Sequence, residues 1–261
     1  MADGVGGWSA HNVNPAMYSR KLCTHIEGIT KTDPRGYLKK AKELIHQAWS
    51  NNHEKGTSTL VVVTLPFEGN VMHTSWVGDS SYCILRVYEN ADYVVSVVHT
   101  SKAQQKGFNY PYQLGWQHGD HPDVAKTDKH ELQEGDIVVV GSDGVFDNLT
   151  PEQIAEVIQK QLQASRGRFD PNMIAKAIAD EAFRFSLDDR YNSPFSKEAA
   201  KYQIKYQGGK SDDIAVSLGQ VRLASYKGTP DSGSEDSQGS KSTSSTADGS
   251  ASTPSQDHTS L

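Results

Sequence analysis

Two aspartates near the middle of the chain stand where an apolar run stops. Residues 137–140 are a short β-branched stretch typical of a buried strand, and the sequence Gly-Ser-Asp-Gly-Val-Phe-Asp that follows contains Asp143 and Asp147. Thr150 and Pro151 then have the residue types of a helix N-cap and a first helical position. The two acids are therefore predicted on a glycine-containing turn between a strand and a helix, a common way to present oxygen ligands to a hard cation.

Taken alone, an Asp-Gly pair after a strand is first of all a turn signal, because Asp bonds to its own backbone and Gly tolerates positive φ. The arrangement recurs, however, at other predicted strand and loop ends. The further acids are Asp3 in a glycine-rich loop, Asp79 after a strand, and Asp212 with Asp213 before a strand. If the strands pack antiparallel, these acids meet at one edge, and their mutual repulsion calls for a cation. All-oxygen ligation selects Mg²⁺ or Mn²⁺.

Two such ions close together would suit the hydrolysis of a phosphate ester, because they lower the pKa of a bound water and offset charge on the phosphoryl oxygens. The sequence contains neither a Gly-x-Ser-x-Gly elbow nor a Cys-x₅-Arg phosphate loop. Gly209-Lys210-Ser211 resembles the end of a nucleotide-binding P-loop, but Ile204 stands where that motif needs a glycine. The prediction is attack by metal-activated water, without a covalent nucleophile.

The composition and charge of the chain argue against some classes of binding partner. The net charge is −6, of which −4 lies in residues 228–261, so no basic face for nucleic acid is indicated. No apolar run approaches the ~20 residues of a membrane span, and the first residues do not form a targeting segment. Cys23 and Cys83 belong to no metal or disulfide motif, and we expect two buried thiols in a reducing compartment. We expect a monomer without nucleic acid or membrane partners.

The remaining elements form an α+β pattern. One helix is predicted after Asn14-Pro15 and a second after Asp33-Pro34, each with an apolar stripe. Short β-rich runs separated by turns predict an antiparallel meander, followed after two more helices and a short one by a final strand. The predicted strands are 58–65, 71–77, 82–88, 93–99, 137–140 and 214–221.

Two stretches lack this periodicity. Residues 100–132 are predicted as a long polar loop, which in a compact domain is more often functional than idle. Its His118 and His121 match no metal-ligand spacing and are expected as solvated loop side chains. Residues 227–261 are rich in Ser, Thr, Gly and Asp and are predicted to be a disordered tail after a domain of residues 1–226.

Four motifs, in this order, resemble the metal-dependent protein Ser/Thr phosphatases of type 2C, the PPM family. They are Asp-Gly-Val-Gly-Gly from Asp3, Gly-Asp-Ser around Asp79, Ser-Asp-Gly-Val-Phe-Asp from Ser142, and Asp-Asp-Ile from Asp212. The ending Gly-Gly-Lys-Ser-Asp-Asp-Ile resembles the T-cell-activation or mitochondrial type 2C-like branch. The resemblance covers residues 1–221.

This resemblance implies a fold and a site. The fold would be a sandwich of two mainly antiparallel sheets with helix pairs on the outer faces, lacking the family strands that precede the Asp3 motif. Asp3, Asp143 and Asp212 would be the catalytic residues and, with the Gly4 carbonyl, would hold two Mg²⁺ or Mn²⁺ ions. Asp79 and Asp147 would match a weaker third site. The substrate would be a phosphoprotein, and the compartment a mitochondrion or plastid.

An alternative function stays open at this point. Because the family's first strands do not precede Asp3 in this sequence, the chain could be a catalytically weak or inactive type 2C-like module with a binding or regulatory role, or a fragment of a longer phosphatase.

Overall fold

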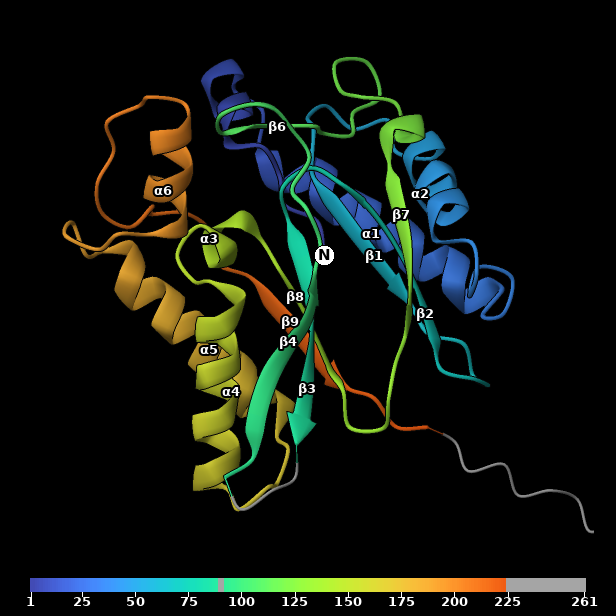
Figure 1. Cartoon of the computed structure of the whole chain (residues 1–261). Helices are drawn as coiled ribbons and strands as arrows, with labels where there is room; N and C mark the ends of the chain where they lie inside the picture. Colours follow the sequence, from blue (N-terminus) through green and yellow to red (C-terminus); the bar gives the residue numbers. More distant parts are fainter. Residues whose placement is uncertain (89–91, 224–261) are drawn as a thin grey trace, which may run out of the picture. The chain divides into compact units, whose positions relative to one another are not determined.

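The computed structural model describes residues 1–88 and 92–223, which form two antiparallel β-sheets with helices on their outer sides (Figure 1). The predicted tail, residues 227–261, lies outside the described residues. No described helix combines the length and apolar character that crossing a membrane would need.

The first sheet has three strands in the order β1-β2-β7, and the second has four in the order β4-β3-β8-β9. All pairings within these two sheets are antiparallel, and a small hairpin of β5 and β6 stands apart. The strands are β1 (Leu60–Thr64), β2 (Val71–Val77), β3 (Ser81–Tyr88), β4 (Val94–Thr100), β5 (Gln105–Gly107), β6 (Tyr110–Pro111), β7 (Lys126–Glu131), β8 (Ile137–Gly141) and β9 (Val216–Gln220).

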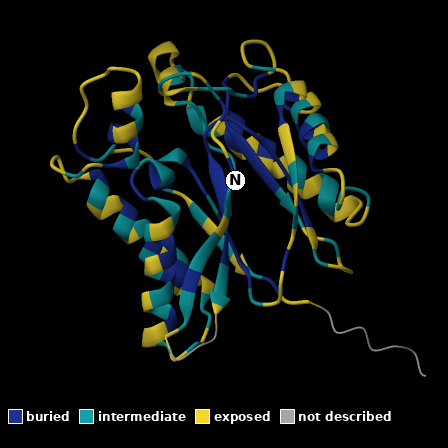
Figure 2. Cartoon of the chain, in the orientation of Figure 1, coloured by how far each residue is buried: buried dark blue, intermediate teal, exposed yellow. Residues whose placement is uncertain are grey.

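Helices cover each sheet on its outer side, with exposed residues facing away from the sheets (Figure 2). The first pair, α1 and α2, packs on the three-stranded sheet, whereas α4 and α5 pack on the four-stranded sheet. The α-helices are α1 (Pro15–Thr32), α2 (Ala41–Ser50), α3 (Asp143–Phe146), α4 (Pro151–Ala164), α5 (Pro171–Ser186) and α6 (Pro194–Lys201), and short 3₁₀ helices are η1 (Gly6–His11) and η2 (Pro122–Val124). This arrangement confirms the predicted α+β sandwich with outer helix pairs.

Three apolar clusters correspond to these layers. Two lie between a sheet and its helices, and a third lies between the sheets, where Met72 and Trp76 of β2 meet Tyr82 and Ile84 of β3. The strands β2 and β3 are buried along most of their length because one face meets the helices and the other meets the opposite sheet. This double burial explains why neither strand shows a simple alternation of apolar and polar residues.

The predicted meander is wrong at one connection. β1 pairs with β2 and β3 pairs with β4, as expected, but β2 and β3 belong to different sheets. The chain changes sheets at residues 78–80, where Gly78 has φ 97° and a Cβ would lie 2.6 Å from a Thr59 side-chain atom. Only glycine fits this turn, and the turn places Asp79 between the sheets.

The second helix begins later than predicted. Residues 34–39 form turns, and α2 starts at Ala41. The Asp33 carboxylate accepts a hydrogen bond from the Gly36 amide at 2.9 Å, which closes a local turn in place of a first helical turn. Tyr37 and Leu38 therefore do not belong to the helical stripe.

The long loop predicted for residues 100–132 contains a regular strand. β7 pairs with β2 over six residues at the sheet edge, and none of its residues is buried. Its sequence, Lys-Thr-Asp-Lys-His-Glu, carries no apolar alternation because an exposed edge strand has no core face to fill. The final strand is shorter than predicted, Val216–Gln220.

The two cysteines differ in environment. Cys83 is buried in β3, and burial raises the pKa of its thiol to about 12, so it is an inert core residue. Cys23 is exposed on α1, so the expectation of two buried thiols is wrong for this residue.

Candidate active site

The first residues of the chain run alongside β1, which positions Asp3. Met1 and Val61 exchange two backbone hydrogen bonds, and the Asp3 carbonyl accepts from the Thr59 amide at 2.9 Å. The following Gly4 lies so close to the start of α1 that a Cβ would meet the Pro15 carbonyl oxygen at 2.3 Å. Asp3 is thus reached from an extended segment and not from an unstructured end.

Asp143 is positioned by the turn between β8 and α3. Ser142 caps this turn: its hydroxyl donates to the Asp213 carbonyl at 2.8 Å and accepts from the Ala215 amide at 3.0 Å. A Cβ at Gly144 would lie 2.4 Å from the same Asp213 carbonyl oxygen. The Asp-Gly pair of this motif therefore lets the segment around Asp213 approach the end of β8 closely.

The buried side chain of Asn148 completes this connection. Its amide nitrogen donates to the carbonyl oxygens of Gly144 and Lys210 at 2.9 and 2.8 Å, and its oxygen accepts from the Lys210 amide at 2.9 Å. Asn148 is fully buried, so these bonds are shielded from water. They fix Lys210 and, two residues later, Asp212 beside α3.

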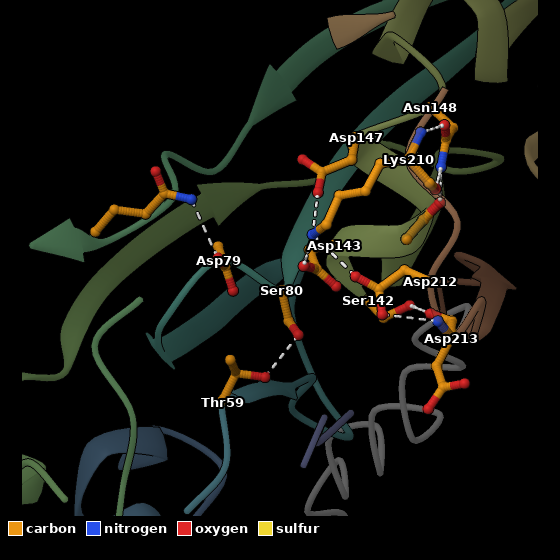
Figure 3. A network of polar contacts seen from close by, with 12 residues as sticks. Thr59, Asp79, Ser80, Ser142, Asp143, Asp147, Asn148, Lys210, Asp212 and Asp213 are labelled. Carbon is orange, nitrogen blue, oxygen red and sulfur yellow. Dashed lines mark hydrogen bonds and ion pairs between the residues drawn. The ribbon is translucent and has the colours of Figure 1, made fainter. Parts of the chain in front are cut away.

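Lys210 lies at the centre of the acidic cluster (Figure 3). Its ammonium contacts one carboxylate oxygen of Asp143 at 2.7 Å, one of Asp147 at 2.7 Å and one of Asp212 at 2.9 Å. The surrounding acids hold the pKa of this ammonium well above its ordinary value, in spite of its burial. Lys210 is therefore a fixed cation that three carboxylates share.

One cavity of about 320 Å³ collects the predicted residues. Its lining includes Asp3, Gly4, Asp79, Asp143 and Asp212, and it also includes Lys210 and the glycine loop that follows Asp3. The sixth predicted residue, Asp147, is linked to this group through the Lys210 ammonium. Asp79 reaches the group from between the sheets, and its carboxylate accepts a hydrogen bond from the side-chain amide of Gln105 at 3.1 Å.

Three carboxylates of this group, those of Asp3, Asp79 and Asp147, have raised pKa values. Burial, followed by the proximity of Asp143, raises the pKa of Asp3 to about 7. Burial and the charge of Asp143 also raise the pKa of Asp79 to about 6. Burial raises the pKa of Asp147 to about 7 although Lys210 acts in the opposite direction. The cluster therefore holds more negative charge than its one ammonium compensates.

These residues fit divalent cations of the Mg²⁺ class. The side-chain donors are carboxylate oxygens, the set that selects Mg²⁺ or Mn²⁺ over softer metals, and their excess charge favours further cations. Within the described residues the carboxylates do not form a group of three with all ligand atoms inside 4.8 Å, because they are spread around the ammonium. Such spacing suits Mg²⁺, which keeps several of its waters and binds through few direct carboxylate contacts.

Two parts of the site were missed from the sequence. Lys210 lies in the Gly-Gly-Lys-Ser-Asp-Asp-Ile motif, but its sequence context does not reveal its partners Asp147 and Asp143, which lie 63 and 67 positions away. Asn148 follows the Asp147 motif and has no predicted role. A buried asparagine carries no chemical signature in a sequence, so only the fold reveals what it connects.

Both the sequence and the fold of this chain are similar to those of known protein phosphatases. The model of the Protein phosphatase 2C family matches residues 119–190, a stretch that contains Asp143 and Asp147. "Protein phosphatase PTC7 homolog" of Xenopus laevis is 33% identical over 236 residues, which cover 85% of this chain and 75% of that protein. This chain belongs to the protein phosphatase 2C family of metal-dependent Ser/Thr phosphatases.

Other relatives place the match in context. "Probable protein phosphatase 2C 80" of Arabidopsis thaliana is 32% identical over 85% of this chain, and the chain spans about half (51%) of that protein's length. The crystal structure described as that of "the photosystem II phosphatase PBCP" superposes with a TM-score of 0.74 at 29% identity, and covers 85% of this chain and 86% of that one. The similarity therefore extends over the described sandwich.

Proposed function

We propose that this chain hydrolyses phosphoserine and phosphothreonine in proteins, using water activated by divalent metal ions. The observation that carries this proposal is that Asp3, Asp143 and Asp212, from three distant segments, line one cavity. Family membership gives the reaction class, and the acidic cavity supplies the ligand type that the class requires. Nothing among the described residues or the relatives favours the alternative of an inactive module.

In this proposal Asp3, Asp143, Asp212 and the Gly4 carbonyl hold two Mg²⁺ or Mn²⁺ ions. Such ions, when bound, lower the pKa of a coordinated water toward neutrality and offset charge on the phosphoryl group. Asp79 and Asp147 would hold a weaker third ion. Lys210 orients Asp143 and Asp147 by donating a hydrogen bond to each, and its charge neutralises part of the cluster before any ion binds.

The same proposal extends to organisation and location. We take residues 1–226 as the phosphatase domain and the active form as a monomer, which sedimentation of a purified 1–226 fragment with retained activity would support. The resemblance to the mitochondrial type 2C-like branch, together with the similarity to the photosystem II phosphatase PBCP, supports a mitochondrion or plastid as the compartment. Fractionation of cells that express the tagged full-length gene product tests this location.

The activity is tested with phosphopeptides that differ only in the phosphorylated residue. The purified chain should release phosphate from phosphoserine and phosphothreonine peptides when Mn²⁺ or Mg²⁺ is present. Phosphate release should stop when EDTA is added and should resume when the ion is restored. A matched phosphotyrosine peptide should be a poor substrate. Hydrolysis that is indifferent to EDTA would contradict the proposal.

A further inference from the structure

A second group of ligating side chains lies where the edges of the two sheets meet, and it consists of His99, Asp128 and His130. His99 belongs to β4, the edge strand of the four-stranded sheet, while Asp128 and His130 belong to β7, the edge of the three-stranded sheet. In residues 1–88 and 92–223 this is the group of three whose ligand atoms all lie within 4.8 Å of one another.

The distances between possible ligand atoms are close to those of a metal site. One Asp128 carboxylate oxygen lies 3.8 Å from the His99 Nε2 and 3.7 Å from the His130 Nε2. Ligands about 2.0–2.1 Å from a tetrahedral Zn²⁺ lie about 3.4 Å from one another. The Asp128 oxygen is therefore within a few tenths of an ångström of this spacing from each imidazole, and all the possible ligand atoms lie within 4.8 Å of one another.

Metal binding by the two imidazoles would leave no neighbouring group without a hydrogen-bond partner. The His99 Nε2 is buried and has no hydrogen-bond partner, which is an unfavourable state for a polar atom. The His130 Nε2 lies 2.8 Å from the Tyr82 hydroxyl, which is also 2.9 Å from the Thr74 hydroxyl. Tyr82 would therefore keep a partner if the His130 nitrogen bound a metal ion.

The protonation state of His130 also suits a ligand. Burial, and then the neighbouring His99, lower the pKa of the His130 imidazole below its ordinary value, although Asp128 acts in the opposite direction. A neutral imidazole keeps the lone pair that a metal ion needs. The Asp128 side chain is 43% exposed, so solvent can reach the group from the side of this carboxylate and fill a remaining coordination position.

We propose that His99, Asp128 and His130 bind one transition-metal ion of the Zn²⁺ type. Two imidazole nitrogens and one carboxylate oxygen select Zn²⁺, Co²⁺ or Ni²⁺ over Mg²⁺, in contrast to the oxygen-only cluster around Lys210. Because the ligands come from edge strands of different sheets, the bound ion cross-links β4 and β7. The site thus stabilises the sandwich and does not depend on the proposed phosphatase activity.

The test is a titration of the purified full-length chain with Zn²⁺ and, separately, with Co²⁺, in an Asp143→Asn background that disables the carboxylate cluster. We expect Zn²⁺ to raise the melting temperature, since an ion that binds only the folded state stabilises it. Co²⁺ should give the intense visible absorption of a four- or five-coordinate site with nitrogen ligands. His99→Gln should weaken binding at least about tenfold, whereas His53→Gln, at a histidine outside the group, should not.

His99→Gln is the informative variant because the His99 Nε2 makes no hydrogen bond whose loss would unfold the chain. Its metal-free melting temperature should match that of the Asp143→Asn parent, and long-range ¹H–¹⁵N spectra of the imidazoles should show Zn²⁺ shifting His99 and His130 in the parent. Zn²⁺ effects that are equal in His99→Gln and its parent, or the absence of Zn²⁺ binding in the parent, would overturn the proposal.

Discussion

Acids lie at both ends of the central strand β8, Asp136 before it and Asp143 after it, and the residues around them differ. Asp136, which precedes the strand, is fully buried and receives two hydrogen bonds of 2.8 Å from the Arg86 guanidinium. The Gln133 amide donates a third bond, also 2.8 Å. The Asp136 charge is thus compensated by Arg86 and fully hydrogen-bonded, which is how a buried ion pair remains compatible with a stable fold.

At the other end of β8 the acids outnumber their cations. Asp143 follows the strand and shares the Lys210 ammonium with Asp147 and Asp212. Burial raises the pKa values of the nearby Asp3 and Asp79 to about 7 and 6, with Asp143 the next contributor in each case. The comparison teaches that a structural acid is compensated inside the protein, whereas the acids that we propose as metal ligands are left short of positive charge, which bound ions would supply.

The largest expected effect comes from removing a charge at the acidic end of β8, and it is a loss of catalysis. Asp143→Asn keeps the size of the side chain but removes a charged ligand, so we expect phosphopeptide hydrolysis to fall about 1,000-fold. The fold should persist, because the change relieves repulsion near Asp3. Steady-state kinetics at saturating Mn²⁺ measures the effect. Asp180→Asn, at an exposed acid of α5 that pairs only with Lys176, is the matched control and should retain activity.

The same substitution at the opposite end of β8 should act on stability. Asp136→Asn leaves the Arg86 charge without its counterion, and we expect the free energy of unfolding to fall by about 3 kcal/mol. The loss is at the lower end for a buried pair because the Arg86 side chain is 21% exposed. Urea unfolding measures it. Activity per folded molecule should be unchanged, and an activity loss matching that of Asp143→Asn would remove the distinction between the two ends.

Asn148 tests how the acidic end is held in place. Asn148→Ala removes three hydrogen bonds and leaves buried groups of Gly144 and Lys210 without partners, so we expect a loss of about 2 kcal/mol in unfolding free energy. Because the same bonds position Asp212, the Mn²⁺ concentration needed for half-maximal activity should also rise. Unfolding and Mn²⁺ dependence are measured on the same preparation. A stability loss without any change in Mn²⁺ dependence would show that Asn148 does not position the site.

Replacing Lys210 is expected to have the smallest effect of the four substitutions. Its ammonium competes with divalent ions for the oxygens of Asp143 and Asp212, so Lys210→Met should increase the affinity for Mn²⁺ about tenfold. Lys176→Met, which removes an exposed lysine of α5, should leave the affinity unchanged. Equilibrium dialysis of Mn²⁺ measures both. Weaker binding in Lys210→Met would mean that the ammonium assists the ions and does not compete with them.

Much of this picture could be predicted from the sequence, for physical reasons. The strand β8 is an unbroken apolar run and β2 and β3 are short β-rich segments between turns, so all three could be identified, and Asp79 and Asp143 were visible because each follows a predicted strand. The order of the motifs then indicated the family. The helix starts at Pro15 and Pro151, each after a capping residue, were also correctly placed, whereas Asp33-Pro34 opens a turn and not a helix.

The features that could not be predicted depend on contacts between residues that are far apart in the sequence. β7 has no buried residue and so no apolar pattern, and the change of sheet at residues 78–80 is set by packing and not by local propensity. The sequence does not show that the fold places the Lys210 ammonium beside three carboxylates. His99 and His130 lie 31 positions apart, on the edges of different sheets. In each case the missing information was a long-range contact.

Calorimetric titration of the metal-free chain with Mn²⁺ tests the central claim most directly, namely that Asp3, Asp143 and Asp212 form one ion-binding group. We predict about two ions per chain in the wild-type protein, and one or none, bound more weakly, in Asp143→Asn. Identical stoichiometry and affinity in the two proteins would contradict the account, because the acid that follows β8 would then not be a ligand.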